Sequence, residues 1–259
     1  MLGAIAGDII GSVHEFRTMK STDFPLFTPE SRFTDDTVLT VAVADCLLTG
    51  AGYVDKFHEY TLAYPHRAYG LRFLTWVKNG YRDPYNSWGN GSAMRVSPVP
   101  YAFDTLEQAL HEAKTTAEVT HNHPEGIRGA LATTMAIFMA RHGGSKKEIR
   151  RAIQKDLGYD LDRTCAGIRK TYKFNESCQE TVPEAIIAFL DSSNYENAIR
   201  LAISLGGDAD TLACITGAIA EAFYGGVPSH IAKQSWALLD DNLRGTVKQF
   251  CDRYKIAIP

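Results

Sequence analysis

The chain has 259 residues, of which 45% are hydrophobic and 22% charged, which is ordinary for a globular protein with a full core. Its formal net charge of -3 provides no general attraction to nucleic acid or to an anionic membrane, so an anionic ligand must be held by local groups. The five cysteines are scattered and form no Cys-x-x-Cys pair, which excludes a disulfide framework or a cysteine zinc site and predicts reduced, buried thiols.

The first residues are apolar, but the stretch is too short for a secretory signal and no basic residue precedes it. No apolar stretch is long enough to span a membrane. Together with the reduced cysteines, these features predict a cytoplasmic protein with neither a membrane nor a nucleic acid as partner.

The first predicted element is a helix over residues 2–13. Gly3, Gly7 and Gly11 are spaced four apart and share one face, where another helix or a ligand could approach closely. Asp8 lies in the middle of this apolar helix, and Glu15 lies just beyond it. We interpret Asp8 as a buried carboxylate that is bonded to a neighbouring backbone or hydroxyl group.

Two acidic stretches, far apart in the sequence, each precede an apolar helix. Thr34-Asp35-Asp36 comes before a helix expected over 38–48, and Asp208-Ala209-Asp210-Thr211 comes before one expected over 212–224. Either stretch alone is typical of a helix cap with a solvated acid. As a pair, their hard oxygens indicate two divalent cations, Mg²⁺ or Mn²⁺, which neighbouring carboxylates would bridge at about 3.5–4 Å.

Two stretches between the acidic clusters could contact a ligand. Residues 53–82 interleave aromatic and basic side chains at helical spacing, and the negative net charge favours helix packing over nucleic-acid binding. The Gly-Asn-Gly-Ser stretch at 89–92 precedes a helical turn and could point N–H groups at a phosphate. It matches neither the Walker pattern nor the dinucleotide fingerprint, so a structural turn is an equal alternative.

Two histidines follow a helix expected over 106–120. We expect His121 to be a hydrogen-bonding or stacking group in the site, and His123 to support the site or to form the turn between helices. A zinc site is not favoured, because no third soft ligand lies nearby.

The rest of the chain is helical in pattern, except for an irregular, polar segment at 158–181 that we expect to be an insertion or a peripheral hairpin. The further helices are expected over residues 127–141, 146–157, 183–190, 196–205, 230–239 and 243–254. Because there are no alternating strand segments, internal repeats or linkers, we predict one all-α domain over residues 1–259.

In their order along the chain, these motifs resemble the ADP-ribosylglycohydrolase family. The resemblance covers nearly the whole chain and rests on Gly7–Ser12 with Glu15, Phe33–Thr37, Gly89–Arg95, Thr120-His121 and Gly206–Thr211. It implies a compact all-α domain of that family's type with two Mg²⁺ or Mn²⁺ ions. It also implies that the protein cleaves the glycosidic bond between ADP-ribose and a modified protein residue or a small conjugate, releasing ADP-ribose.

The same resemblance implies roles for individual residues. The metal ligands would be Thr34, Asp35, Asp36, Asp208, Asp210 and Thr211, and ADP-ribose would be held by Gly89, Asn90, Gly91, Ser92, Met94 and His121. Glu15 would lie beside the scissile ribose. Water would attack an oxocarbenium-like ribose while a carboxylate takes its proton; we choose Asp35 as that base, with Asp36 or Glu15 as alternatives.

Two further hypotheses concern the leaving group and the reaction class. The segment 158–181 leaves little room for elaborate substrate-recognition loops, so the target stays open. Arginine is slightly preferred over serine, because an acidic pocket attracts a guanidinium and a serine alkoxide is the poorer leaving group. The alternatives are a non-catalytic ADP-ribose-binding or structural homologue and a dinuclear-metal phosphoesterase.

Overall fold

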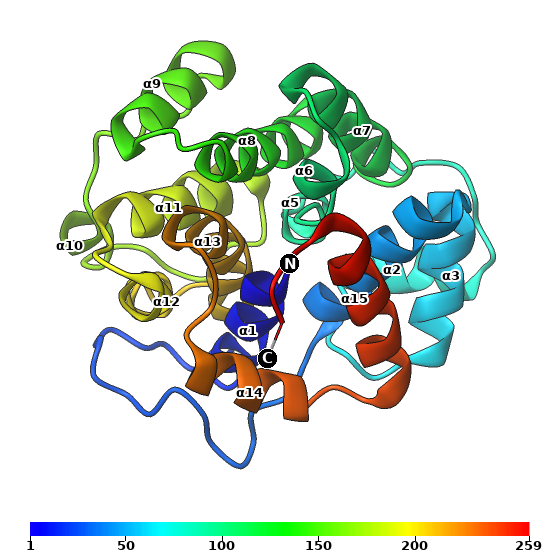
Figure 1. Cartoon of the computed structure of the whole chain (residues 1–259), viewed down its shortest axis with the longest axis horizontal. Coiled ribbons are helices and arrows are strands. Elements are labelled where there is room, and N and C mark those ends of the chain that lie inside the picture. The colour runs from blue at the N-terminus through cyan, green and yellow to red at the C-terminus, as the bar shows by residue number, and fades with distance from the viewer. Residues whose placement is uncertain (259) are drawn as a thin grey trace.

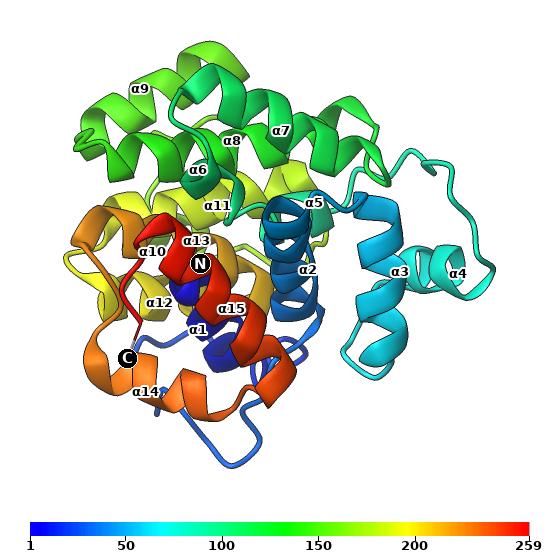
Figure 2. The same ribbon diagram turned by 45° about the vertical axis from the view of Figure 1, so that its right-hand side comes forward.

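The computed structural model describes residues 1–258, which form fifteen α-helices and no β-strand. The helices are α1 (Leu2–Gly11), α2 (Asp35–Thr49), α3 (Tyr53–Ala63), α4 (Leu71–Lys78), α5 (Gly91–Met94), α6 (Val99–Ala102), α7 (Leu106–Glu118), α8 (Pro124–Arg141), α9 (Lys146–Leu157), α10 (Cys165–Ile168), α11 (Cys178–Asp191), α12 (Tyr195–Ser204), α13 (Ala209–Tyr224), α14 (Ser229–Ala237) and α15 (Asp241–Tyr254). Figure 1 shows α1 and α13 near the centre, and Figure 2 shows α3 and α4 at one side. The prediction of an all-α fold is confirmed.

Most of the buried hydrophobic side chains belong to one connected cluster, which extends along the chain from Met1 to Cys251. All five cysteines are free and buried, as predicted. Within residues 1–258, no helix has both the length and the apolar character that crossing a membrane requires.

Most of the predicted helices are present, with ends shifted by a few residues. Helices α2 and α13 begin three residues earlier than predicted, so both acidic stretches reach into the first turn of a helix. The prediction of an irregular segment through residue 181 was wrong, because α11 begins at Cys178 and contains Pro183 in its interior. The aromatic and basic stretch at 53–82 forms two separate helices, α3 and α4.

The antiparallel pair α1 and α13 approaches so closely that side chains cannot fit between the two backbones. The three glycines of α1 face carbonyl oxygens of α13; the pairs are Gly3 with Gly217, Gly7 with Ala213 and Gly11 with Ala209. A Cβ atom added to Gly7 would lie 2.0 Å from the carbonyl oxygen of Ala213. The glycine face predicted from the sequence is therefore a helix–helix contact. It holds the start of α13 beside the end of α1.

Gly7→Ala is expected to lower the free energy of unfolding by about 3 kcal/mol or to prevent folding, because the two backbones must separate. The matched control is Gly245→Ala in α15, where an added Cβ meets nothing within 4 Å. This control is expected to stabilise the protein by about 0.5–1 kcal/mol through helix propensity. Urea unfolding followed by circular dichroism measures both, and wild-type stability of Gly7→Ala would contradict the close contact.

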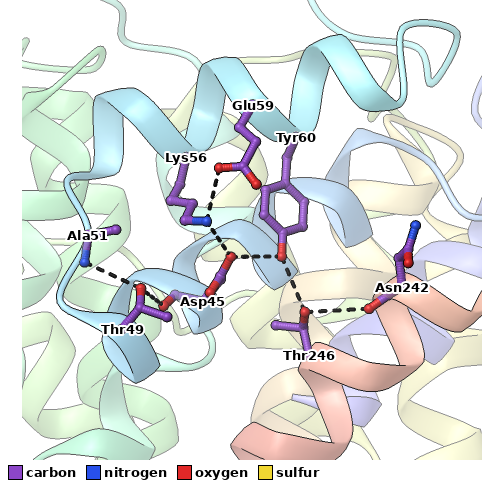
Figure 3. Close-up of polar contacts among 8 residues, drawn as sticks. All are labelled: Asp45, Thr49, Ala51, Lys56, Glu59, Tyr60, Asn242 and Thr246. Atoms are coloured by element: carbon purple, nitrogen blue, oxygen red, sulfur yellow. Dashed lines mark hydrogen bonds and ion pairs between the residues drawn. The ribbon is translucent and has the colours of Figure 1, made fainter.

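A polar network holds the far end of α2 to α3 and α15 (Figure 3). The Lys56 ammonium group lies 2.9 Å from the carboxylates of both Asp45 and Glu59. The Tyr60 hydroxyl donates to Asp45 at 3.1 Å and lies 3.3 Å from the hydroxyl of Thr246 in α15. Because Asp45 belongs to α2, this network helps to set the direction of the helix whose first turn carries the acids.

Candidate active site

A cavity of about 270 Å³ is lined by the first turns of α2 and α13, the start of α4 and the glycine-rich stretch at 89–91. It brings together most of the residues predicted for the site, from segments far apart in the sequence. The predicted residues in its wall are Glu15, Asp35, Asp36, Gly89, Asn90, Gly91, Met94, His121, Asp208, Asp210 and Thr211. Thr34 and Ser92 do not line the cavity, although both lie in segments that do.

Asp8 anchors the start of α2. Its carboxylate accepts hydrogen bonds from the backbone N–H groups of Thr34 (3.0 Å) and Thr37 (3.1 Å) and from both of their hydroxyls. Burial raises the pKa of Asp8, and these hydrogen bonds oppose that shift. The interpretation of Asp8 as a hydrogen-bonded buried carboxylate is therefore confirmed. Thr34 is the N-cap of α2, so its hydroxyl also accepts from the backbone N–H of Asp36.

The acids at one end of the cavity repel one another. Asp36 and Asp210 are buried, and burial together with this mutual repulsion raises the pKa of both well above the usual range. Burial is also the main reason why the pKa of Asp208 is raised to about 6 and that of Glu15 to about 8. Asp35 is half-buried, and its pKa is raised for the same reasons. In residues 1–258, no ion pair with a basic side chain neutralises these acids.

The two acidic stretches meet in the folded chain. The Thr211 hydroxyl donates to Oδ2 of Asp36 at 3.3 Å, whereas Oδ1 of Asp36 is buried without a hydrogen-bond partner. Oε2 of Glu15 is also buried and unpaired. Leaving such oxygens unpaired is costly, and divalent cations among them would offset both this cost and the repulsion. In the part of the chain that the structure describes, no three potential ligands among His, Cys, Asp and Glu are gathered around one point. Carboxylate and hydroxyl oxygens are nevertheless the kind of ligand that Mg²⁺ and Mn²⁺ prefer.

The other end of the cavity is basic and aromatic. Arg72 donates to the carbonyl oxygen of Tyr85 at 2.7 Å. Its guanidinium carbon lies 5.2 Å from the ring centroid of Tyr85 and 5.8 Å from that of Trp88. The Tyr85 ring lies 6.1 Å from the ring of His121. The cavity thus has an acidic end suited to cations and sugar hydroxyls, and a basic end suited to an anion and a flat ring.

His121 is buried in the cavity wall, and burial lowers its pKa well below the usual value, so the ring is neutral. Arg95 donates to the Thr120 hydroxyl at 2.9 Å, and that hydroxyl lies 2.8 Å from Nδ1 of His121. We assign the ring proton to Nε2, because the Thr120 hydroxyl can then donate to Nδ1. A Cβ atom on Gly91 would lie 3.1 Å from that Nε2 atom. His123 instead caps the N-terminus of α8, and its ring lies 6.1 Å from that of Trp88 in the cavity wall.

The glycine-rich stretch is connected to the acidic end through Asn90. The Asn90 amide donates to Oδ2 of Asp208 at 2.7 Å. The hydroxyl of Ser92 is buried and donates to the carbonyl oxygen of Gly126 at 2.7 Å, so it supports the turn from behind. The backbone at Gly89 and Gly91 and the side chain of Met94 form the wall itself.

Two parts of the cavity wall were not predicted from the sequence. Leu71, Arg72 and Phe73 belong to the aromatic and basic stretch that we attributed to helix packing, and the interleaved arginine was the available signal. Phe174 and Glu176 belong to the segment at 158–181, so the prediction that this whole segment is peripheral was wrong. No sequence pattern distinguished these two residues.

The cavity of this all-helical protein combines buried carboxylates, hydroxyls and a glycine-rich turn. These groups are suited to the acid–base chemistry of a hydrolase. A model of the ADP-ribosylglycohydrolase family matches residues 1–257, and the chain belongs to this family. The resemblance inferred from the motifs is thereby confirmed, and the protein is an enzyme of the ADP-ribosyl glycohydrolase class.

Individual relatives agree with this assignment. The chain is 27% identical to ADP-ribosylhydrolase ARH3 of Mus musculus, with 87% of this chain and 82% of that protein covered. It is 24% identical to ADP-ribosylarginine hydrolase Tri1 of Pseudomonas putida (strain GB-1), with 92% and 73% covered. A solved structure described as an ADP-ribosylglycohydrolase-related protein complex is similar with a TM-score of 0.71 and 23% identity, and 99% of this chain and 97% of that chain are covered. This last likeness supports the fold.

Proposed function

We propose that this protein hydrolyses the glycosidic bond of ADP-ribosylated proteins or small ADP-ribosyl conjugates in a reaction that depends on two divalent cations, Mg²⁺ or Mn²⁺. The main support is the cavity with two unlike ends. The acidic end suits cations and the hydroxyls of a ribose, and the basic, aromatic end suits a diphosphate and an adenine ring. Family membership supports the same reaction.

The oxygens at the acidic end would hold the cations. Five of the proposed ligands line the cavity, and these are Asp35, Asp36, Asp208, Asp210 and Thr211. The sixth, Thr34, lies outside the lining, where its hydroxyl caps α2 and donates to Asp8. Bound there, divalent cations would supply Lewis-acid activation of water and would orient the ribose hydroxyls.

The protein's own carboxylates would handle the proton. Asp35 lines the cavity and is only half-buried, so its carboxylate can accept a proton from the attacking water. Asp36 and Glu15 remain alternatives for this role. Glu15 would lie beside the scissile ribose, whose transition state is oxocarbenium-like.

The diphosphate of ADP-ribose would be held at the glycine-rich stretch. Gly89 and Gly91 line the cavity without a side chain, so a phosphate group can approach the backbone of this turn closely. The Nε2–H group of His121 and the guanidinium of Arg72 would donate from the same side. Asn90, Ser92 and Met94 would keep this turn in place beside the acids.

Arg72→Gln is expected to weaken the binding of free ADP-ribose about 10- to 100-fold, because a hydrogen bond to a charged group contributes about 1.5–3 kcal/mol. Isothermal titration calorimetry measures the affinity. The matched control is Arg82→Gln, since Arg82 is exposed, pairs with Asp55 and lies outside the cavity lining. If the Arg72 variant and the wild type bound ADP-ribose with equal affinity, Arg72 would not belong to the proposed binding site.

We further propose a slight preference for arginine-linked over serine-linked ADP-ribose. Glu15, Asp35 and Asp36 would attract a guanidinium leaving group, whereas a serine alkoxide needs a proton donor or help from a metal. The name of the relative Tri1, an ADP-ribosylarginine hydrolase, is consistent with this choice. The test compares kcat/KM on two peptides that differ only in the linkage. A clear serine preference would overturn it.

Product analysis tests the proposed reaction. The protein is incubated with ADP-ribosylated arginine and, separately, with a nitrophenyl phosphate, each with Mg²⁺ or Mn²⁺ and with a chelator. Release of ADP-ribose that stops when the chelator is added is the expected result. Release of phosphate would indicate a phosphoesterase, and the absence of both products would indicate a binding or structural role.

A further inference from the structure

Exposed large hydrophobic side chains gather at the mouth of the main cavity. Seven such side chains are exposed in residues 1–258, and three of them, Leu71, Trp88 and Phe174, line the cavity. A fourth, Phe16, is stacked on Phe174. Because exposed apolar surface is unfavourable unless something covers it, such a grouping indicates a contact surface.

Phe16 and Phe174 form an aromatic pair beside the acidic end of the cavity. Their ring centroids lie 6.1 Å apart with 27° between the ring planes. The two side chains remain 78% and 48% exposed, respectively. Phe16 directly follows Glu15, and Phe174 lines the cavity together with Glu176. The pair therefore lies on the outer surface next to the position proposed for the scissile bond.

A second groove, of about 850 Å³, continues from Phe174 along residues 162–184. Buried Glu184 lies in its wall; one carboxylate oxygen accepts from Arg163, and Oε2 has no hydrogen-bond partner. Oε1 of Gln179 is also buried and unpaired in this wall. Two other carboxylates of the groove lining, those of Asp162 and Glu180, are exposed, and they are complementary to the N–H donors of a polypeptide backbone or of a basic side chain.

We propose that the polypeptide carrying the ADP-ribosyl group docks across the aromatic pair Phe16–Phe174 and extends into the second groove. This proposal rests on the proposed function, because it takes the ADP-ribosyl group to lie in the main cavity. The residues on either side of the modified one must then lie where the cavity opens. There the aromatic pair contacts an apolar neighbour of the modified residue, and the exposed carboxylates of Asp162 and Glu180 receive N–H donors. The preferred substrate is therefore a protein rather than a small conjugate.

The test compares kcat/KM on an ADP-ribosylated peptide, with an apolar residue next to the modified one, and on the ADP-ribosylated free amino acid. Phe16→Ser is expected to lower kcat/KM about tenfold on the peptide, as loss of one buried apolar side chain predicts, and to leave the small conjugate unaffected. Phe16→Leu is expected to retain most of the activity on the peptide. Leu238→Ser is the matched control, because Leu238 is exposed but lines neither the cavity nor the groove.

The small conjugate reports directly on the integrity of the active site, because it has no polypeptide to dock. Equal losses on both substrates in Phe16→Ser, or unchanged kcat/KM on the peptide, would overturn the docking surface while leaving the proposed reaction in place. If the wild-type protein released ADP-ribose from neither substrate, the proposed function would fail, and the docking proposal with it.

Discussion

Asp36→Asn and Asp210→Asn are each expected to reduce the release of ADP-ribose on the order of 100- to 1000-fold and to weaken the binding of Mg²⁺ or Mn²⁺. Both side chains are buried at the acidic end of the cavity, and Oδ1 of Asp36 has no hydrogen-bond partner. An amide is a weaker ligand for a hard cation than a carboxylate, so each variant should lose most of the cation's binding energy.

The same variants should have an opposite effect when no cation is present. Burial and mutual repulsion raise the pKa of Asp36 and Asp210 well above the usual range, so removing one charge relieves the repulsion. We expect the melting temperature without metal to equal or exceed that of the wild type. The increase in melting temperature that the wild type gains from the cation should be largely lost.

Thermal unfolding and titration calorimetry, each with Mg²⁺ and with Mn²⁺, measure these effects apart from activity. The matched control is Asp55→Asn, because Asp55 is an exposed aspartate whose partner is Arg82, outside the cavity. Full cation affinity in both Asp36→Asn and Asp210→Asn would contradict the proposed ligand set.

Asp8→Ala is expected to cause the largest loss of stability of any single change to a polar residue at the site, about 3–5 kcal/mol. The carboxylate of Asp8 is fully buried and accepts from two backbone N–H groups and two hydroxyls, those of Thr34 and Thr37. Alanine would leave these donors without an acceptor at the N-terminus of α2. The first turn of α2 would then lose its anchor, so cation affinity should fall as well.

Asp8→Asn tests whether hydrogen bonding is the cause, because asparagine keeps one acceptor oxygen. We expect this variant to lie between the wild type and Asp8→Ala in the free energy of unfolding, measured with urea. Asp55→Ala, an exposed substitution, should change stability by less than about 0.5 kcal/mol. Wild-type stability of Asp8→Ala would show that α2 is positioned by other contacts.

The helices could be predicted wherever their ends depend on neighbouring residues. Helix α9 was predicted over its full length, and the structure shows that its start depends on local residues, because Ser145 and Glu148 form a capping box there. The start of α11 was missed because Pro183 is typical of a helix beginning, whereas the observed first turn lies before it. That turn is held in part by the backbone N–H of Cys178, which donates to the carbonyl oxygen of Trp88. A contact between such distant parts of the chain leaves no local pattern.

The ligands proposed for the site were recognisable in the sequence because hydroxyls and acids at helix starts form a local pattern. Their meeting in one cavity depends on the tertiary structure. Close backbone contact at Gly7 aligns α13 with α1, and the carboxylate of Asp8 fixes the start of α2 beside them. The sequence indicated that a glycine face and a buried acid exist, but it did not reveal their partners.

The positions of Arg72 and Phe174 in the cavity wall could not be predicted from the sequence by itself. Local pattern was sufficient for the helical class of the fold and for the two acidic stretches, because periodicity and capping involve residues a few positions apart. The basic end of the cavity and the Phe16–Phe174 pair were decided only by the tertiary structure. The exposure of a side chain and the identity of its neighbours depend on segments that are distant in the sequence, and folding alone brings those segments together.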